Sequence, residues 1–374
     1  MPSKIIDEDV ETISKDIGIV AHILSGKTLL ITGGAGFLGR YFLATLDYLN
    51  KNVLEKPCRI ISVDNFITGQ KYDLQESPTF QPIHHNLKFP LEIDEDIDFI
   101  IHAAGIASPK FYRTYKIETI DVGTLGTKHM LELARYKNVK SMVFFSSSEV
   151  YGDPDPSKVP TPETYCGNVD CTGPRANYDE SKRIGETFCI AYHEVHGIPV
   201  KMIRPFNVYG PGMRKDDMRV VPNFILNVFH GNALPVYGGG QNTRTFCYIT
   251  DAMTGFFKIL LSDFNGESFN VGTDKEEVSV ETLAKTVASL FDQPVEIKNT
   301  AGINDAYSAI DPKRRCPDIT KLSTKLGYTP KIDLRSGVLR FTKWAIEDNW
   351  SKVSDVKLKT ETPLQENDLN KRQF

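Results

Sequence analysis

The sequence has few of the residues that build metal centres or disulfide frameworks. Its 374 residues include only six cysteines, eight histidines and two tryptophans. No two cysteines form a C-x-x-C pair, and His193 and His196 have no third ligand motif nearby, so we expect no metal site. Reduced thiols, as in a cytoplasmic protein, are expected at Cys58, Cys166, Cys171, Cys189, Cys247 and Cys316.

Long apolar runs and an excess of positive charge are also missing. No apolar stretch approaches the roughly 20 residues that span a bilayer. The first residues, which include Asp7 and Glu8, do not resemble a signal peptide. The formal net charge is −4 and the isoelectric point is about 6.1. We therefore expect a cytoplasmic protein that binds neither nucleic acid nor a membrane.

A glycine-rich loop follows the first apolar run of the chain. The run reads as a buried parallel strand, Gly33, Gly36 and Gly39 come next, and a helix is predicted over 37–50. Such glycines allow a tight turn, the approach of a pyrophosphate to backbone N–H groups, and close packing of helix on strand. Asp64 ends the next strand, where its carboxylate can accept from a ribose diol and repel a 2′-phosphate. This pattern predicts NAD rather than NADP.

Tyr178 and Lys182 are four residues apart in a predicted helix and so lie on one face of it. Tyrosine ordinarily has a pKa near ~10, and a neighbouring ammonium group favours the phenolate. The tyrosine could then act as a base at neutral pH. Y-x-x-x-K alone is a weak pattern, but here it follows a nucleotide loop and the serines of 146–148. Together they predict hydride chemistry on an alcohol.

Predicted strands and helices alternate between residues 27 and 204. Helices are expected near 37–50, 116–137 and 176–196. This pattern predicts an α/β fold with a doubly wound parallel sheet of the Rossmann type, in which ligands bind at the carboxyl ends of the strands. The strands are expected at 27–32, 59–64, 80–85, 97–103, 141–146 and 199–204.

The chain is predicted to have four parts. An N-terminal amphipathic helix lies within 1–25, followed by an NAD-binding domain over 26–204. A smaller α/β substrate domain covers 205–350, with segments such as 240–255 returning to the first domain. The last part, 351–374, is rich in Lys, Glu, Asp, Thr and Gln and is expected to be a flexible tail.

From residue 26 to about 345 the chain resembles the extended short-chain dehydrogenase/reductases that modify nucleotide sugars, and within them the UDP-glucuronate decarboxylases. Matching segments in the order of the family are far more specific than any one motif. The segments are 146–154, 165–169, 173–180, 204–213, 219–225, 241–246 and 314–319.

The resemblance implies a reaction that begins at the C4 hydroxyl of a sugar. Tyr178 would take the hydroxyl proton while NAD takes the hydride, and Ser147 would hydrogen-bond the same hydroxyl. Lys182 would lower the pKa of Tyr178 and hold the nicotinamide ribose. Oxidation turns a glucuronate into a β-keto acid that loses CO2, and the hydride then returns, so NAD is tightly bound and recycled. The residues matched to the decarboxylation step are Ser148, Glu149 and Arg315.

The same resemblance assigns two sets of binding residues. The residues expected to bind NAD are Gly33, Gly36, Phe37, Leu38, Gly39, Asp64, Asn65, Asn86, Leu87, Ala103, Ala104, Gly105, Lys182 and Arg204. The residues expected to bind the nucleotide sugar are Ser108, Tyr112, Glu149, Tyr178, Asn207, Arg219, Val221, Tyr237, Arg244 and Arg315. In the second set, Arg219 and Arg244 would meet the diphosphate, and Val221 and Tyr237 would line the uridine pocket.

Some positions depart from the decarboxylase pattern, mostly around the expected sugar and diphosphate. The family has a more compact Ala-Ser-Pro run where this chain has residues 103–112. The substrate could therefore differ from UDP-glucuronate. The other departures are Tyr115 and Lys116 in place of Asn-Pro, Gly123 in place of Asn, Ser181 in place of Gly, Gly212 in place of Arg, and Asn86 in place of Asp.

Three alternative functions stay open. A nucleotide-sugar 4,6-dehydratase normally needs an Asp-Glu pair where this chain has Ser148 and Glu149. A 4-epimerase needs no acid or base at C5, so Glu149 would be idle. A non-catalytic dinucleotide sensor, or a nucleic-acid-binding relative, would typically lose the tyrosine or gain a basic face, whereas this chain keeps Tyr178 and Lys182.

Relatives of this kind commonly dimerise through two helices from each subunit. The corresponding helices here are those predicted at 116–137 and 176–196. A homodimer with a four-helix bundle at its interface is therefore expected.

Overall fold

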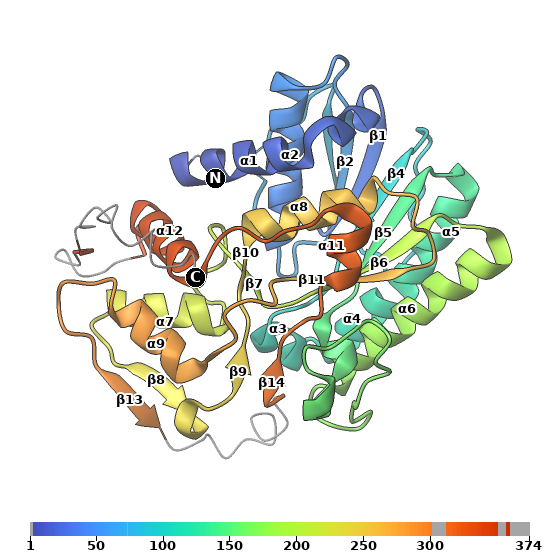
Figure 1. Ribbon diagram of the computed structural model, residues 1–374. Coiled ribbons are helices and arrows are strands. Elements are labelled where there is room, and N and C mark those ends of the chain that lie inside the picture. The colour runs from blue at the N-terminus through green and yellow to red at the C-terminus, as the bar shows by residue number, and fades with distance from the viewer. Residues whose placement is uncertain (1–2, 73, 301–311, 351–356, 360–374) are drawn as a thin grey trace.

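The computed structural model describes residues 3–72, 74–300, 312–350 and 357–359. Its centre is a parallel sheet of seven strands in the order β11-β6-β5-β4-β1-β2-β3 (Figure 1). The strands predicted between residues 27 and 204 are all present, and β11 joins the sheet from much later in the chain. The strands are β1 (Thr28–Thr32), β2 (Arg59–Asp64), β3 (Phe80–His84), β4 (Phe99–His102), β5 (Ser141–Phe145), β6 (Val200–Pro205) and β11 (Ser268–Val271).

Helices cover both faces of the sheet, which explains why its strands read as continuous apolar runs. Successive residues of β1 show this, because Leu29 and Ile31 belong to one core cluster and Leu30 to the other. One face carries α1 (Lys4–Ile17), α2 (Phe37–Asn52) and α8 (Ile249–Leu260), and the other carries α4 (Lys116–Asp121), the π-helical turn η2 (Val122–Gly126), α5 (Thr127–Lys137) and α6 (Ala176–His196).

The predicted N-terminal helix is present and belongs to the core. In α1, Ile13 is fully buried, and the helix packs against α2 and α8. The buried Asp9 accepts hydrogen bonds from the hydroxyls of Tyr41 (3.1 Å) and Tyr248 (2.8 Å) and pairs with Arg340 (2.8 Å). These partners come from α2, the segment before α8, and the C-terminal helix α12 (Leu334–Glu347). Helix α1 therefore connects the N-terminal part of the chain to the C-terminal helix α12.

A smaller unit lies beside the carboxyl edge of the sheet (Figure 1). Within it α7 (Val220–Phe229) and α9 (Val280–Ala288) pack on the parallel pair β8 (Leu234–Tyr237) and β13 (Ile297–Thr300). The short strands of this region are β7 (Val208–Tyr209), β9 (Thr243–Arg244), β10 (Cys247–Tyr248), β12 (Val278–Ser279) and β14 (Arg314–Arg315). The boundary at residue 205 stays a prediction, because α8, β11 and α11 (Thr320–Leu326) all return to the larger layer.

Most of the predicted tail, 351–374, lies outside the described residues. Its described part, residues 357–359, pairs with the chain that follows α9. Leu358 forms an isolated antiparallel bridge with Phe291, and the Lys359 N–H donates to the Leu290 carbonyl at 2.9 Å. This short piece is therefore docked on the smaller unit.

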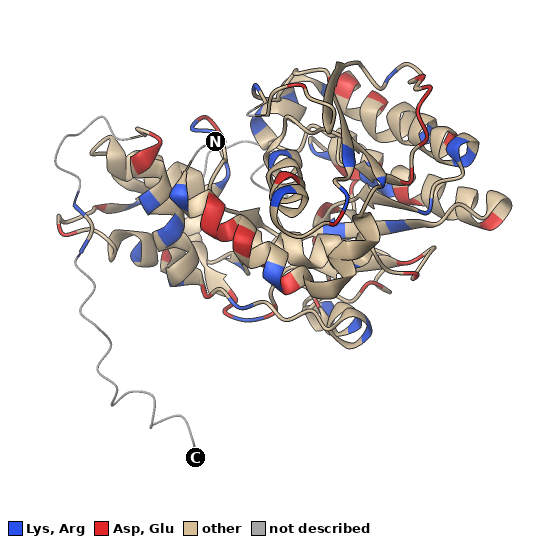
Figure 2. Ribbon diagram, turned by 90° about the horizontal axis from the view of Figure 1, so that it is seen from above, with Lys and Arg blue, Asp and Glu red and all other residues tan. Residues whose placement is uncertain are grey.

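Basic and acidic residues are both spread over the helices and loops of the described chain (Figure 2). None of the helices in these ranges is both long and apolar enough to cross a bilayer. The six cysteines are free thiols, of which Cys166 and Cys171 are exposed. In the same ranges no group of three or more His, Cys, Asp or Glu side chains could hold a metal ion.

Two departures from the decarboxylase pattern prove to be one packing contact. Gly123 lies in the π-helical turn η2, and a Cβ atom added there would come within 2.6 Å of the Ser181 Cβ on α6. The Ser181 hydroxyl donates to the Tyr178 carbonyl at 2.7 Å. The serine thus occupies space that only a glycine opposite leaves open, and this pair concerns helix packing rather than the substrate.

We expect Gly123 and Ser181 to be energetically coupled. Gly123→Ala should destabilise the fold because its methyl group meets Ser181, and Ser181→Gly should remove part of that penalty. In a double-mutant cycle followed by urea unfolding, the coupling should exceed about 0.5 kcal/mol. Gly126→Ala, one turn on, serves as the control and should be additive with Ser181→Gly. Additivity for the Gly123 pair would contradict the packing argument.

Candidate active site

Two adjoining cavities open at the carboxyl edge of the sheet. One, of about 380 Å³, lies over the ends of β1, β2 and β4. The other, of about 360 Å³, lies between the end of β5, the start of α6 and the smaller unit. They form one cleft because they share the lining residues Phe37, Leu38, Ala103, Gly105, Ala107 and Arg219.

The first cavity is built around the glycine-rich loop. Gly33 has a φ of +74°, and a Cβ there would lie 2.7 Å from the Ala104 backbone nitrogen. A Cβ on Gly39 would overlap the carbonyl oxygen of Gly33, so helix α2 can sit this close only with glycine. Gly36 is the N-cap of α2. The N-terminus of a long helix therefore faces this cavity, an arrangement that favours a pyrophosphate.

Asp64 lies at the end of β2 in the same cavity. Its carboxylate accepts hydrogen bonds from the backbone N–H groups of Ala35 (3.0 Å) and Phe66 (2.7 Å). Burial raises the pKa of Asp64 above its ordinary value. Each carboxylate oxygen can accept a further hydrogen bond, so this loop-bound carboxylate suits a ribose diol. The first cavity is lined by the predicted cofactor residues Gly33, Gly36, Phe37, Leu38, Gly39, Asp64, Asn65, Asn86, Leu87, Ala103, Ala104 and Gly105.

Tyr178, Lys182 and Ser147 meet in the second cavity. Tyr178 is 6% exposed, and the ring of Tyr112 stacks on it with centroids 5.0 Å apart and planes 13° apart. The Lys182 ammonium donates to the Phe145 carbonyl at 2.7 Å and lies 5.9 Å from the centre of the Tyr178 ring. The predicted trio therefore comes together at the end of β5 and the first turns of α6.

The prediction that Lys182 lowers the pKa of Tyr178 stays a prediction, because burial dominates the pKa values of both groups in this structure. Burial raises the pKa of Tyr178 to about 12, and a hydrogen bond with Ser147 opposes this only in part. Burial also lowers the pKa of Lys182 to about 8. Both groups lose hydration, so each is moved toward its neutral form, and the ammonium is directed to a backbone carbonyl instead of the phenol.

A buried cluster of charges lies beside this trio. Glu149 pairs with Arg315 at 2.8 Å and with Arg175 in a still closer contact. Burial acts to raise the pKa of Glu149, but the two guanidinium groups hold it below its ordinary value. Arg175 also faces Asp179, with its Nε 3.6 Å from the Asp179 carboxylate. Burial and the nearby Glu149 raise the pKa of Asp179 to about 7.

Arg175 and Asp179 were not predicted as site residues. Both lie in the matching segment 173–180, which was the only signal for them, since charges at the start of a helix are usually solvated. The structure buries both, with 5% of each residue exposed. Arg175 lines the cavity, and Asp179 lies behind it.

Further cationic and amide groups line the second cavity. The Asn207 side-chain amide donates to the Thr245 carbonyl at 2.9 Å, and Asn207 has a left-handed φ of +41°. Arg244 donates to the Thr243 carbonyl at 2.8 Å. Arg219 pairs with Asp217 at 2.6 Å. These groups line the cavity together with Val221, and their assignment to the diphosphate and the nucleobase stays a prediction.

Three predicted residues lie outside both cavities. Ser108 and Tyr237 are absent from the lining, and Tyr237 is 46% exposed on β8. Arg204, predicted to bind the cofactor, lines neither cavity. Its guanidinium group instead pairs with Glu186 (2.5 Å) and donates to the Tyr151 hydroxyl (2.7 Å). Its position on β6 therefore does not support a role in cofactor binding.

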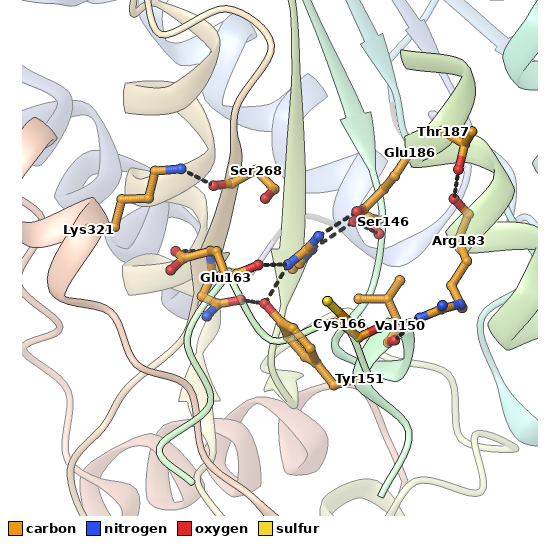
Figure 3. A network of polar contacts seen from close by, with 12 residues as sticks. Ser146, Val150, Tyr151, Glu163, Cys166, Arg183, Glu186, Thr187, Ser268 and Lys321 are labelled. Carbon is orange, nitrogen blue, oxygen red and sulfur yellow. Dashed lines mark hydrogen bonds and ion pairs between the residues drawn. The ribbon is translucent and has the colours of Figure 1, made fainter. Parts of the chain in front are cut away.

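Figure 3 shows the polar network that contains Ser146, Tyr151 and Glu186. Glu186 accepts from the Ser146 hydroxyl at 2.5 Å, and the Tyr151 hydroxyl donates to the Asn270 side chain at 2.7 Å. Ser146 follows β5, Glu186 lies on α6 and Asn270 lies on β11. The network therefore holds β5, α6, β6 and β11 together behind the cleft.

Comparison with known sequences places these observations in a family. The profile of the NAD dependent epimerase/dehydratase family matches residues 29–272. The UDP-glucuronic acid decarboxylase 5 of Arabidopsis thaliana is 41% identical over 317 residues, which cover 84% of this chain and 88% of the relative. The UDP-glucuronic acid decarboxylase 1 of Xenopus tropicalis is 38% identical over 315 residues, covering 83% of this chain and 70% of the relative.

Solved structures share the fold. A UDP-N-acetylglucosamine 4-epimerase from Methanobrevibacter ruminantium aligns with a TM-score of 0.75 and 23% identity, covering 87% of this chain and 99% of that one. A dTDP-glucose 4,6-dehydratase from Streptomyces venezuelae, solved with NAD, aligns with a TM-score of 0.71, 23% identity and the same coverage. The family depends on NAD, and the first cavity has the loop, helix terminus and acid that fit this cofactor. The chain is therefore an enzyme, and it belongs to the NAD-dependent epimerase/dehydratase family.

Proposed function

We propose that this enzyme is a UDP-glucuronate decarboxylase, which yields UDP-xylose or its 4-keto form. The observation that carries the proposal is the pairing of Glu149 with Arg175 and Arg315 beside Tyr178, in one cavity. One buried and one largely buried guanidinium group next to an alcohol-oxidising tyrosine suit a sugar that bears a carboxylate. The names of the relatives in Arabidopsis thaliana and Xenopus tropicalis support the same substrate.

The first step takes place between Ser147 and Tyr178. The sugar C4 hydroxyl lies between their two hydroxyl groups, Ser147 orients it, and Tyr178 accepts its proton. When bound, NAD accepts the hydride from C4 and later returns it. Lys182 sits one helical turn further along α6, where it is placed to hold the nicotinamide ribose and, as a cation, to stabilise the phenolate once the cleft is filled.

The second step is loss of the carboxylate. With a ketone at C4, the bond from C5 to the carboxylate carbon breaks, CO2 leaves, and the electron pair flows into the enolate of the ketone. A proton is then delivered to C5. Arg315 and Arg175 orient the departing carboxylate, and Glu149, held between them, is placed to handle the proton at C5. Tyr178 returns its proton to the C4 oxygen when the hydride comes back.

The other end of the substrate is bound by the far part of the cavity. Arg219 and Arg244 supply guanidinium groups for the diphosphate, and Asn207 adds a side-chain amide. Val221 gives an apolar wall for the base. These assignments place the sugar near the trio and the nucleotide against the smaller unit.

We also propose that the protein is a cytoplasmic homodimer. Apolar side chains are exposed along the helices expected at the interface, among them Ile117 (64%), Leu125 (41%) and Tyr136 (81%). Ile184 on α6 is 39% exposed. Apolar patches of this kind are typical of subunit interfaces. The exposed free thiols of Cys166 and Cys171 suit a reducing compartment.

The function is tested by incubating the purified enzyme with UDP-glucuronate and NAD and reading the products by mass spectrometry and NMR. Loss of one CO2 with a xylose-type or 4-keto-pentose spectrum is expected. An unchanged mass with inverted C4 would establish an epimerase instead, and loss of water a dehydratase. No turnover of UDP-glucuronate, with turnover of another sugar from a panel of UDP-, dTDP-, GDP- and CDP-sugars, would also refute the proposal.

Tyr178→Phe should reduce kcat by roughly 10³-fold, because no other hydroxyl in the cleft can take the C4 proton in the same place. Steady-state kinetics on UDP-glucuronate measures the effect. Tyr165→Phe removes a tyrosine hydroxyl outside both cavities and should change kcat less than about twofold. A similar loss in both variants would point to general damage rather than to a role in proton transfer.

Glu149→Gln should lower kcat by about 10²-fold, since the carboxylate is lost from the C5 side of the sugar. KM for UDP-glucuronate should not rise, because Arg175 and Arg315 lose a competitor for the sugar carboxylate. Glu180→Gln, on the exposed side of α6, is the matched control and should behave as the parent. Full activity of Glu149→Gln would favour the epimerase.

Leu125→Asp should weaken the dimer, because a charge would be buried in the apolar bundle. Light scattering after size-exclusion chromatography should show monomer at concentrations at which the parent is a dimer. Ile19→Asp, at an exposed apolar residue just after α1 on the other face of the sheet, should leave the dimer intact. A monomeric parent protein would contradict the proposed homodimer.

A further inference from the structure

Asp179 is a charged group that the proposed mechanism does not use. It follows Tyr178 on α6 and is 5% exposed. Its Oδ1 is buried and has no hydrogen-bond partner in the described part of the chain. Its other oxygen faces the Arg175 Nε at 3.6 Å, which is longer than a hydrogen bond. Arg175 itself makes its closest contact with Glu149.

This geometry disfavours the ionised form of Asp179. A buried carboxylate oxygen without a donor loses its hydration and gains nothing in return. The charged and titratable groups that face Asp179 are Glu149, Arg175, Arg315 and Tyr178. Burial and Glu149 oppose ionisation, the two arginines favour it only in part, and the pKa of Asp179 is raised to about 7. The group thus takes up or releases a proton near neutral pH.

The charge of the cluster depends on that proton. With Asp179 protonated, Arg175 and Arg315 outweigh Glu149 by one positive charge. With Asp179 ionised, the four groups are neutral together. Arg244 also acts on the Glu149 carboxylate and adds a positive charge in both states, whereas Arg219 pairs with Asp217. Protonation of Asp179 therefore makes the cluster more positive by one unit for an incoming sugar carboxylate.

We propose that Asp179 is a specificity-determining residue that acts through Arg175, and that its proton adapts the site to a uronate rather than a neutral sugar. The inference rests on the proposed function and deepens it. Binding of the uronate carboxylate near the cluster makes ionisation of Asp179 less favourable. By linkage, a uronate must then bind together with a proton at pH values where free Asp179 is ionised, whereas a neutral sugar does not require it.

The test compares UDP-glucuronate with UDP-glucose by isothermal titration calorimetry. The parent for all measurements is the Tyr178→Phe variant loaded with NAD, so that no turnover disturbs the titration. The ratio of the two affinities should fall by roughly tenfold between about pH 6 and about pH 9, if the bound carboxylate raises the pKa of Asp179 by about one unit. Lys182 also titrates in this range, and its contribution is the same in the parent and in Asp179→Asn, so the difference between these two variants reports on Asp179.

Asp179→Asn, added to the parent, fixes this position in a neutral form of the same shape. The affinity ratio should then stay high and nearly constant with pH. Asp251→Asn, which removes another buried carboxyl with a raised pKa far along the chain on α8, should leave the pH dependence of the parent unchanged. A ratio in Asp179→Asn that still falls with pH would overturn the proposal.

Proton uptake by the parent decides the matter even if Asp179→Asn does not fold. Titrations near pH 8 in two buffers with different ionisation enthalpies should show more proton uptake with UDP-glucuronate than with UDP-glucose. Equal uptake with both ligands would refute the inference while leaving the decarboxylase in place. Binding of UDP-glucose without any binding of UDP-glucuronate would refute the proposed function itself.

Discussion

Glu149 is an ionised carboxylate buried at the junction of the two units, and the cleft depends on how it is neutralised. It lies in the 3₁₀ turn η3 (Ser148–Tyr151) directly after β5, while Arg175 precedes α6 and Arg315 belongs to β14 of the smaller unit. A buried charge without partners costs several kcal/mol, so η3, the start of α6 and β14 must pack together when the protein folds. The same docking places Ser147 and Tyr178 against each other. The residues that recognise the substrate and the catalytic trio thus depend on the same packing of these segments.

Behind the cleft, a second ion pair keeps the same elements in register. Glu186 lies one helical turn after Lys182, and Ser146 precedes Ser147. The side chains of Glu186, Ser146 and Arg204 therefore connect both catalytic segments to β6. The network of Figure 3 extends from there to β11 through Asn270. Arg204 therefore makes contacts within the protein, although its segment matches the pattern of the family. An ion pair with little exposed side chain and several further hydrogen bonds favours one arrangement of the strands over its alternatives.

Much of the fold could be predicted from the sequence, because the physical causes are local. The strands are apolar on both faces, and Gly33 and Gly39 are required where a side chain has no room, so β1 to β6 and the cofactor loop were found. The strand β11 was missed because it joins the sheet after a long excursion through the smaller unit. The meaning of Gly123 and Ser181 was also missed, since only the docked helices show that they meet.

Less of the site could be predicted from the sequence, because a motif does not specify how deeply a side chain is buried or in which direction it points. The spacing of Tyr178 and Lys182 predicts one helix face, but the pKa of each is set by the loss of hydration around it. A matching segment indicates that Arg204 is present, not that it points away from the cofactor. Arg175 reads as a surface charge at a helix start until α6 is packed against η3.

The central claim is that the C4 hydride leaves the sugar and returns to the same carbon while CO2 is lost. UDP-glucuronate carrying deuterium at C4 tests this directly, with the product examined by NMR and mass spectrometry in ordinary water. The account predicts a UDP-pentose that keeps the deuterium at C4 and gains one solvent hydrogen at C5. A UDP-pentose that carries ordinary hydrogen instead of deuterium at C4, or a six-carbon product that keeps its carboxylate, would contradict it.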